Sequence, residues 1–365
     1  MMCKAHSKKN RVCFVSLKAY PLFNPDISSV FGGAEVDLYM LATELANDER
    51  FEVSFIVGDY GQPPLEVRQG VTLIKSLDAK KTKILHGWKI WKALRRADAD
   101  VYMQEACSLG TFLIALFCKI HRRRFVYRTA STQEADGTYR HDHPIAGRLF
   151  LWSLKNAAAV VVQNQQDADN FKQQGGIDAR VISNGLIVSG YPSAEKSIIL
   201  WVGRSAAIKG PRRFLTLARA FPNESFVMIC QNATGDEHYG SLIQEAGAIG
   251  NLTFIERVPF HKIDHYFETA KIYVNTSDSE GFPNTFVQAC KAGAAILSFA
   301  VNPDGFLDTY QCGCCCQGQE QKMAEYLSRM LENNRYQELG RNGAAYARQH
   351  HDIRRIIGHY KELFI

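Results

Sequence analysis

The sequence has no long hydrophobic run. Its longest apolar stretch, Phe112–Cys118, is far shorter than the roughly 20 residues that a membrane-spanning helix needs. The opening segment MMCKAHSKKNRVCF contains basic residues but no apolar core followed by a small-residue cleavage site, so we expect no secretory signal. These absences favour a cytoplasmic protein.

The sequence also has little excess charge. The chain contains 43 Lys and Arg against 37 Asp and Glu, a formal net charge of +6 in 365 residues. A dedicated nucleic-acid binder usually carries a larger positive charge, so we expect no nucleic-acid partner. Apolar residues make up 46% of the chain, which excludes disordered, collagen-like and coiled-coil proteins.

The cysteines lack the spacing of a zinc site. Four of them form a run at Cys312 and Cys314–Cys316, without paired C-x-x-C motifs and without a nearby histidine. We therefore predict a loop or the start of a helix at this run, and no metal.

Short apolar segments alternate with segments of helical length. The apolar segments that we predict as strands are Val12–Leu17, Val53–Val57, Val101–Gln104, Phe125–Arg128, Ala159–Gln163, Ile198–Gly203, Phe226–Cys230, Leu252–Ile255, Ile272–Asn275 and Ala295–Ser298. Continuous apolar strands are typical of parallel sheets that are buried on both faces. Residues 184–196 are expected to link two such series, so the sequence predicts an α/β protein with two Rossmann-like domains.

Three strand-to-helix loops contain candidate ligand-binding groups. In the first, Gly32 and Gly33 directly precede a predicted helix, Glu35–Asn47. Paired glycines let a backbone approach a ligand closely, and a helix start attracts anions. The alternative is a simple turn.

The second loop follows the strand that ends at Gly203. Arg204 and Lys209 lie on it, ahead of Gly210. A guanidinium and an ammonium together suit a doubly charged phosphate. The alternative is a pair of solvated surface cations.

The third loop has the sequence SEGFPNTFVQ. We expect Pro283 to take the first position of a helix and the amides of Asn284 and Thr285 to form an anion cradle. Glu280 would repel a phosphate and is better suited to neutral hydroxyls, and Gln288 lies about one turn into the helix. Alternatively, Glu280 only complements the helix dipole and Gln288 is a surface residue.

A diphosphate flanked by hydroxyl-rich groups is a nucleotide sugar. The motifs FGGAE, VGR-x4-KG and EGFPNTFVQA resemble those of the family-four retaining glycosyltransferases with the GT-B fold. The resemblance implies two facing Rossmann-like domains with a cleft between them. It also implies an acceptor domain over residues 1–190, a donor domain over 191–345 and a helix over 346–365 that crosses back to the first domain.

The resemblance also implies roles for individual residues. Arg204 and Lys209 would hold the donor diphosphate, and Glu280 would contact the donor sugar; these three are the expected catalytic residues. Gln288 stands where the family usually has a second Glu that binds the ribose. The remaining expected donor-binding residues are Gly32, Gly33, Gly203, Gly281, Phe282, Pro283, Asn284 and Thr285. The donor would be a UDP- or GDP-sugar, with no cofactor, no metal and retention of configuration.

An acceptor is expected on the first domain. The loop after Phe125–Arg128 is polar, and its candidate acceptor residues are Arg128, Glu134, Asp136, His141 and His143. A histidine with a near-neutral pKa is a plausible proton acceptor in such a loop. The alternative is a solvated loop without such a role.

The segment Lys80–Arg96 combines charge with amphipathicity. It contains seven Lys or Arg and no acidic residue, and its apolar residues Ile84, Leu85, Trp88, Trp91 and Leu94 fall on one helical stripe. A basic helix with two tryptophans suits an anionic membrane surface, which implies peripheral attachment to the inner face of a membrane. The alternative is a packed helix with a solvated basic face.

The expected activity is therefore the transfer of a sugar to a glycan or lipid-linked acceptor in the synthesis of a cell-surface polysaccharide or lipopolysaccharide. Two alternatives remain open on the same scaffold: a nucleotide-sugar epimerase or phosphorylase, and a non-catalytic sugar-binding protein.

Overall fold

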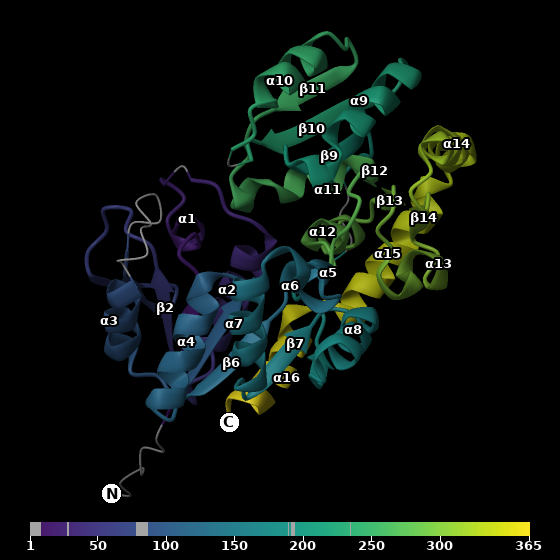
Figure 1. Ribbon diagram of the computed structural model, residues 1–365. Helices are drawn as coiled ribbons and strands as arrows, with labels where there is room; N and C mark the ends of the chain where they lie inside the picture. Colours follow the sequence, from purple (N-terminus) through teal and green to yellow (C-terminus); the bar gives the residue numbers. More distant parts are fainter. Residues whose placement is uncertain (1–8, 28, 78–86, 189, 191–193, 234) are drawn as a thin grey trace, which may run out of the picture. The chain divides into compact units, whose positions relative to one another are not determined.

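The computed structural model describes residues 9–27, 29–77, 87–188, 190, 194–233 and 235–365. The chain forms two compact units, each built around a largely parallel β-sheet (Figure 1). The first unit comprises Met1–Gly185 with Ile353–Ile365, and the second comprises Leu186–Asp352. The predicted α/β class with two Rossmann-like domains is confirmed.

The first unit contains a sheet in the order β3-β4-β2-β1-β5-β6-β7-β8. Its strands are β1 (Asn10–Val15), β2 (Phe51–Val57), β3 (Leu65–Arg68), β4 (Val71–Lys75), β5 (Val101–Glu105), β6 (Arg124–Arg128), β7 (Ala159–Val162) and β8 (Ala179–Val181). Its helices are α1 (Tyr20–Phe23), α2 (Gly33–Leu45), α3 (Gly87–Ala97), α4 (Leu109–Ile120), α5 (Thr132–Ala135), α6 (Thr138–Asp142), α7 (Pro144–Lys155), α8 (Gln165–Gly175) and α16 (Ile353–Phe364).

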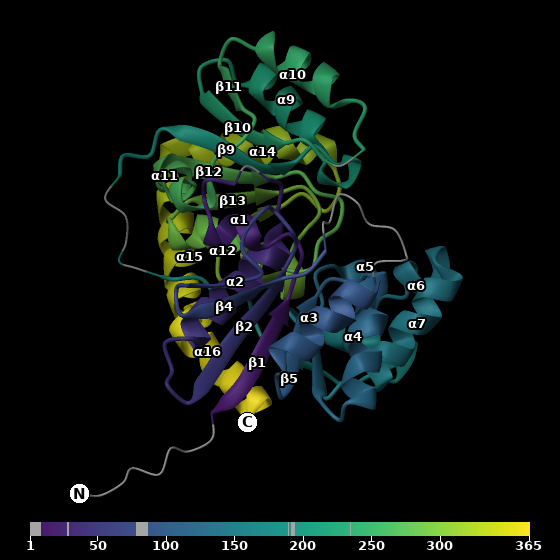
Figure 2. The same cartoon turned by 90° about the vertical axis from the view of Figure 1, so that its left-hand side faces the viewer.

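Helices α3, α4 and α7 lie side by side on one face of this sheet (Figures 1 and 2). Right-handed crossovers from β4 to β5, from β5 to β6 and from β6 to β7 place them there. Their inner residues, among them Leu94, Ile114 and Phe150, share one core with side chains of the strands. The outer sides of these three helices are left to the solvent.

The C-terminal helix α16 belongs to the first unit, where it packs against α2. The guanidinium of Arg124 donates to the carbonyl oxygens of Leu363 and Phe364. Lys361 Nζ lies 2.7 Å from Asp48 Oδ2. The helix begins at Ile353, seven residues after the position expected from the resemblance.

The second unit contains a parallel sheet in the order β11-β10-β9-β12-β13-β14. Its strands are β9 (Ile198–Arg204), β10 (Ser225–Gln231), β11 (Leu252–Ile255), β12 (Ala270–Asn275), β13 (Ala295–Ser298) and β14 (Gly313–Cys315). Its helices are η3 (Ala207–Lys209), α9 (Pro211–Ala220), α10 (Tyr239–Gly247), η4 (Phe260–Lys262), α11 (Asp264–Thr269), α12 (Asn284–Lys291), η5 (Pro303–Gly305), α13 (Phe306–Thr309), α14 (Glu320–Leu331), η6 (Glu332–Asn334) and α15 (Tyr336–His350).

The strand order reverses between β9 and β12. The chain leaves β9 toward α9 and β10, and it leaves β12 toward α12 and β13, so the two connections diverge to opposite sides. Such a switch point opens a crevice at the carboxyl ends of the two strands, which is where open α/β sheets bind ligands. The loops that follow β9 and β12 are therefore the ones that we expect to contact a ligand.

Four strands escaped the sequence prediction because they are short or lie near sheet edges. β3 and β4 form an antiparallel hairpin in which β3 has no buried residue, so neither is a continuous apolar run. β8 has three residues. The middle of the cysteine run, Gly313–Cys315, forms β14, which corrects the predicted loop or helix start. A Cβ at Gly313 would lie 2.2 Å from the carbonyl oxygen of Ile296, so only glycine allows this strand to pair so closely.

Only part of the predicted basic helix lies in the described chain. Residues 80–86, with Ile84 and Leu85, lie outside it, and α3 begins at Gly87. Of the predicted apolar stripe, Leu94 is buried and Trp91 packs edge-on against the ring of Phe117. Trp88 is 60% exposed. Of the three stripe residues in the described helix, Trp91 and Leu94 therefore pack into the core of the first unit and only Trp88 is exposed.

A buried ionic network lies where β5 and β6 end. The Arg128 guanidinium, 1% exposed, donates to Asp37 and Glu105, and its second Nη donates to Asn184 Oδ1 at 2.7 Å. Tyr360 of α16 is also fully buried beside it. Burial raises the pKa of Glu105 despite the adjacent guanidinium. The network joins α2, α16, two strands and the end of the first unit.

Arg128→Leu is expected to lower the free energy of unfolding by about 3–5 kcal/mol, because it leaves two buried carboxyl groups without their counter-charge. Denaturant unfolding followed by circular dichroism measures this change. Arg180→Leu, at an exposed arginine of β8, is the matched control and should have little effect. Adding Glu105→Leu to Arg128→Leu should recover part of the loss; a loss below about 1 kcal/mol in the single variant would contradict the structural role.

Candidate active site

Lys209 and Glu280 form an ion pair at the switch point of the second sheet. Lys209 Nζ lies 2.6 Å from Glu280 Oε2, and the two side chains are 23% and 15% exposed. Lys209 ends the short helix η3 after β9, and Glu280 lies in the loop after β12. The structure therefore joins two of the three predicted catalytic residues, which are 71 positions apart in the sequence.

Hydrogen bonds and an ion pair connect the two loops. The Thr276 hydroxyl donates to the Lys209 carbonyl oxygen at 2.6 Å, and Asp278 N donates to Ile208 O at 2.9 Å. Arg213 donates to Thr276 O at 3.0 Å and pairs with Asp278 at 2.9 Å. These bonds fix the position of the Lys209 loop relative to the Glu280 loop before any ligand arrives.

Glu280 is held in its ionised form by its surroundings. Its Oε1 accepts hydrogen bonds from Ser277 Oγ at 2.6 Å and from Asn275 Nδ2 at 2.8 Å. Burial raises the pKa of this carboxyl group, but the Lys209 ammonium and the two hydrogen bonds outweigh burial, so the pKa lies below its ordinary value. A carboxylate in this state can accept hydrogen bonds from hydroxyl groups of a ligand.

Arg204 is the last residue of β9 and is exposed. Its side chain makes no hydrogen bond or ion pair with the rest of the described chain.

Gly210 directly follows η3 and has a φ of +54°. A Cβ at this position would lie 2.6 Å from Thr276 O. Glycine at this position therefore permits the close approach of the two loops.

The helix α12 begins at Asn284, so Pro283 is its N-cap and not its first residue, one position from the prediction. A helix leaves its first amides without an intrahelical acceptor, and here these belong to Asn284 and Thr285. The Phe282 ring is buried against Phe306, so Gly281 and Phe282 can offer a ligand only their backbone groups. Gln288 is 7% exposed on the same helix.

The Gly32–Gly33 loop belongs to the first unit. Gly32 is the N-cap of α2, and its N–H donates to Glu35 Oε2 at 2.7 Å, while Glu35 Oε1 accepts from Ser16 Oγ at 3.1 Å. The chain's own carboxylate thus takes part of the anion-binding position that the paired glycines predicted.

Two of the predicted acceptor residues are structural. Arg128 lies in the buried network described above. Glu134 is buried and accepts hydrogen bonds from Cys107 N at 3.0 Å and from the Tyr127 hydroxyl at 2.7 Å. Burial raises the pKa of Glu134. Its carboxyl group ties the loop after β5 to the loop after β6 and does not face the solvent.

The other three predicted acceptor residues are more accessible. Asp136 caps the turn before α6 by accepting from Thr138 N at 2.8 Å. The His141 side chain is 90% exposed beside Asp142. His143, also exposed, lies with its ring centroid 5.0 Å from that of Tyr139. The two histidines, together with Asp142, are thus side chains of this loop that a ligand can reach.

A pocket of about 340 Å³ lies beside the Ser205–Gly210 loop. Its lining includes Arg212, Arg213 and His238, but neither Lys209 nor Glu280. Arg212 is paired with Glu245, and Arg213 is paired as described above, so these cations are already neutralised.

Two further searches cover the described residues. No cluster of three or more His, Cys, Asp or Glu side chains among them is arranged to hold a metal ion. None of the helices in the described chain combines the length and the apolar character needed to cross a membrane.

The supporting residues around Glu280 were not predicted. Asn275 and Ser277 stand in the NTS sequence at the end of β12, and Arg213 stands in α9. Polar residues directly after an apolar strand indicate a possible site. The sequence does not show, however, that these residues donate hydrogen bonds to Glu280. No sequence pattern indicates the role of Arg213, because arginines are common on surface helices.

Comparison with known proteins identifies the family. A model described as "Glycosyl transferases group 1" matches residues 189–350, and one described as "Glycosyltransferase Family 4" matches residues 31–189. No curated protein sequence matches the chain.

Solved structures show the same fold. A sucrose-phosphate synthase from Thermosynechococcus elongatus superposes with a TM-score of 0.80 at 16% identity, over 98% of each chain. A UDP-forming α,α-trehalose-phosphate synthase from Burkholderia xenovorans gives 0.75 at 13% identity, over 97% of this chain and 100% of that one. WaaG, a glycosyltransferase involved in lipopolysaccharide biosynthesis, gives 0.71 at 15% identity, over 97% and 99%. The chain has the GT-B fold and belongs to the group 1 glycosyltransferases of the family-4 type.

Proposed function

We propose that this glycosyltransferase moves a sugar from a nucleoside-diphosphate sugar, UDP- or GDP-linked, to a hydroxyl group of a glycan or lipid-linked acceptor. The observation that carries the proposal is the Lys209–Glu280 pair at the switch point, with Arg204 exposed at the end of the neighbouring strand. Cations for a diphosphate and a carboxylate for hydroxyls thus lie on adjoining loops. A nucleotide sugar offers both chemical groups in one molecule.

The proposed reaction breaks the bond between the sugar's anomeric carbon and the phosphate oxygen. Negative charge grows on the departing diphosphate, where Lys209, Arg204 and the first amides of α12 stabilise it more strongly than in the ground state. These groups supply the stabilisation that a divalent cation would otherwise give, so we propose that transfer is independent of metal. Full activity in the presence of EDTA is the expected result.

Retention of configuration is proposed from the same arrangement. The acceptor oxygen attacks the anomeric carbon on the face that the phosphate leaves, and the departing phosphate oxygen takes the acceptor's proton. The products are a glycoside with the donor's anomeric configuration and a nucleoside diphosphate. Glu280 holds sugar hydroxyls during this step, and Gln288 serves the ribose through its amide oxygen and nitrogen.

The acceptor is proposed to meet the first unit at the loop that bears His141 and His143. We further propose that the enzyme works peripherally at the inner face of a membrane, in the synthesis of a cell-surface glycan. The basic residues of Lys80–Arg96 that lie in α3 support this placement.

Lys209→Ala and Arg204→Ala are each expected to lower kcat by about 100- to 1,000-fold, as the loss of one charge-stabilising donor does in other enzymes. Release of nucleoside diphosphate from UDP- and GDP-sugars measures the rate, and circular dichroism checks the fold. Lys262→Ala, at an exposed lysine of the same unit, is the matched control. Unchanged turnover in both site variants would overturn the proposal.

Glu280→Gln is expected to lose stability in a pH-dependent way. The folded-state pKa of Glu280 lies below the ordinary 4.5, so its carboxylate stabilises the fold above about pH 4.5 and loses this effect as the pH falls through the folded pKa. The difference in free energy of unfolding between wild type and Glu280→Gln should therefore shrink when the pH is lowered from 6 to below 4. Glu237→Gln, at an exposed glutamate, is the control. A difference that stays constant over this range would contradict the assignment.

A further inference from the structure

The outer face of α4 is an apolar stripe. Leu109, Leu113, Leu116 and Ile120 follow the spacing i, i+4, i+7 and i+11, which places them on one side of the helix. Leu109 is 64% exposed and Ile120 58%, and Leu113 and Leu116 between them are half-buried. The opposite side of α4 is buried in the core of the first unit. A surface helix normally shows the reverse pattern, with polar residues outside.

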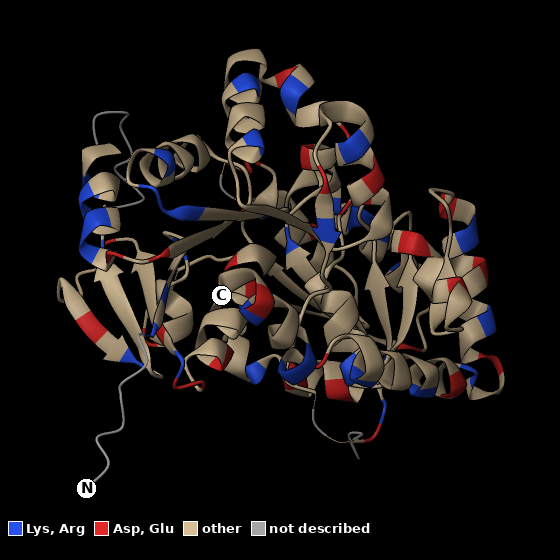
Figure 3. Ribbon diagram, turned by 90° about the horizontal axis from the view of Figure 1, so that it is seen from below, with Lys and Arg blue, Asp and Glu red and all other residues tan. Residues whose placement is uncertain are grey.

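Cations line one side of this stripe. Helix α3, which packs beside α4, carries Lys89, Lys92, Arg95 and Arg96 and has no acidic residue. Figure 3 shows the Lys and Arg positions of the chain in blue and the Asp and Glu positions in red. None of these four side chains forms an ion pair or hydrogen bond with another described residue. Trp88, at the start of the same helix, is 60% exposed.

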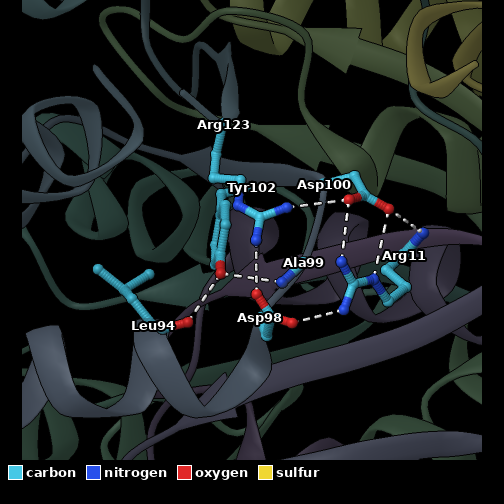
Figure 4. Close-up of polar contacts among 7 residues, drawn as sticks. All are labelled: Arg11, Leu94, Asp98, Ala99, Asp100, Tyr102 and Arg123. Carbon is cyan, nitrogen blue, oxygen red and sulfur yellow. Dashed lines mark hydrogen bonds and ion pairs between the residues drawn. The ribbon is translucent and has the colours of Figure 1, made fainter. Parts of the chain in front are cut away.

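The carboxylates nearest to the end of α3 are already neutralised. Asp98, directly after the helix, pairs with Arg11 and Arg123, each at 2.6 Å. Asp100 pairs with the same two arginines, at 3.1 and 3.0 Å (Figure 4). The Tyr102 hydroxyl closes the helix end by donating to Leu94 O at 2.7 Å. Within the described residues, therefore, Asp98 and Asp100 do not compensate the positive charge of α3.

The other side of the stripe is also basic. Helix α7 packs against α4 and exposes Arg148 and Lys155, and Ile145 at its start is 78% exposed. Lys119 of α4 lies 5.0 Å from the centre of the Trp152 ring. An aliphatic stripe with uncompensated cations on both sides is the pattern of a surface that enters the interface of an anionic bilayer.

We propose that the α3–α4–α7 face, defined by the outer residues named above, docks onto an anionic lipid bilayer. The aliphatic side chains of α4 would enter the headgroup layer, while the cations of α3 and α7 contact lipid phosphates. A helix of 12 residues is about 18 Å long, too short to cross the bilayer, so α4 lies in its plane. The even spread of positive charge favours a lipid surface over a second copy of this chain, whose equal charge would repel it.

The topology gives this docking a consequence for the acceptor. Helices α3, α4 and α7 each follow a parallel strand, so they begin at the carboxyl edge of the sheet, where the loop with His141 and His143 also starts. Docking would therefore bring that edge to the membrane, where the headgroup of a lipid-linked acceptor lies. The docking deepens the membrane placement given under the proposed function, and this last step also rests on the proposed acceptor.

The test is co-flotation of the full-length protein with vesicles of phosphatidylcholine alone or of equal parts phosphatidylcholine and phosphatidylglycerol. We expect binding to the anionic vesicles only, weakened by high salt. The triple variant Lys92→Gln, Arg95→Gln and Arg96→Gln should bind about 100-fold more weakly. The double variant Leu109→Ser and Ile120→Ser should bind at least about tenfold more weakly.

Matched controls use exposed residues elsewhere. Arg180→Gln, Arg219→Gln and Arg341→Gln combined, and Leu65→Ser with Val67→Ser on β3, should bind as wild type does. Circular dichroism confirms that each variant folds. Absence of wild-type binding, or wild-type binding by both face variants, would overturn the proposal. So would a dimer seen by sedimentation that the Leu109→Ser, Ile120→Ser variant abolishes, without vesicle binding.

Thermal shift with UDP and GDP in the absence of vesicles separates this inference from the proposed function. Stabilisation by a nucleoside diphosphate without vesicle binding overturns the docking and the proposed membrane placement, and it leaves the donor assignment intact. Vesicle binding without any response to nucleoside diphosphates or their sugars overturns the donor assignment and leaves the docking intact.

Discussion

The adjacency of β9 and β12 determines what the second unit can bind. Neighbouring parallel strands lie about 4.8 Å apart, so the loops that leave their carboxyl ends must run close together before they diverge. Hydrogen bonds from Thr276 to Lys209 and from Asp278 to Ile208 use this closeness to lock the loops. Lys209 and Glu280 then meet without either loop having to reorganise. A preorganised charge arrangement of this kind costs little when it acts on a ligand.

The chain contains two ionic groupings of opposite character. The Arg128 network is enclosed, its charges are matched among themselves, and several elements of the first unit depend on it. The Lys209–Glu280 pair is partly exposed and rests on a rigid loop pair, so an incoming group can reach it. Burial converts the first grouping into a structural clamp, whereas partial exposure leaves the second available for exchange with a ligand's charges.

Local sequence predicted the elements but not the contacts between them. The central strands of the second sheet are apolar runs, and α9 is an amphipathic segment. Both patterns can be recognised in the sequence without knowledge of the tertiary structure. The Lys209–Glu280 contact depends on strand order, which no local pattern encodes. Arg128 and Glu134 were assigned to an acceptor site because a polar residue at a strand end looks the same in sequence whether its side chain points inward or outward. Trp91 and Leu94 fell on a predicted membrane stripe for the same reason, although they pack inward.

The cations of α3 and Lys209 differ in how they attract an anion, because, among the described residues, only Lys209 has a carboxylate beside it. The cations of α3 form no ion pair or hydrogen bond with another residue that the structure describes, so they attract an anionic surface over a distance that salt controls. Lys209 already has Glu280 beside it, so the pair exerts little net charge at a distance. A ligand gains fully from this pair only when it offers an anion to the ammonium and hydroxyl donors to the carboxylate together. Inorganic phosphate offers only the anion, whereas a nucleotide sugar offers both the anion and the hydroxyl groups. Glu280 therefore makes the site selective for a nucleotide sugar over phosphate alone.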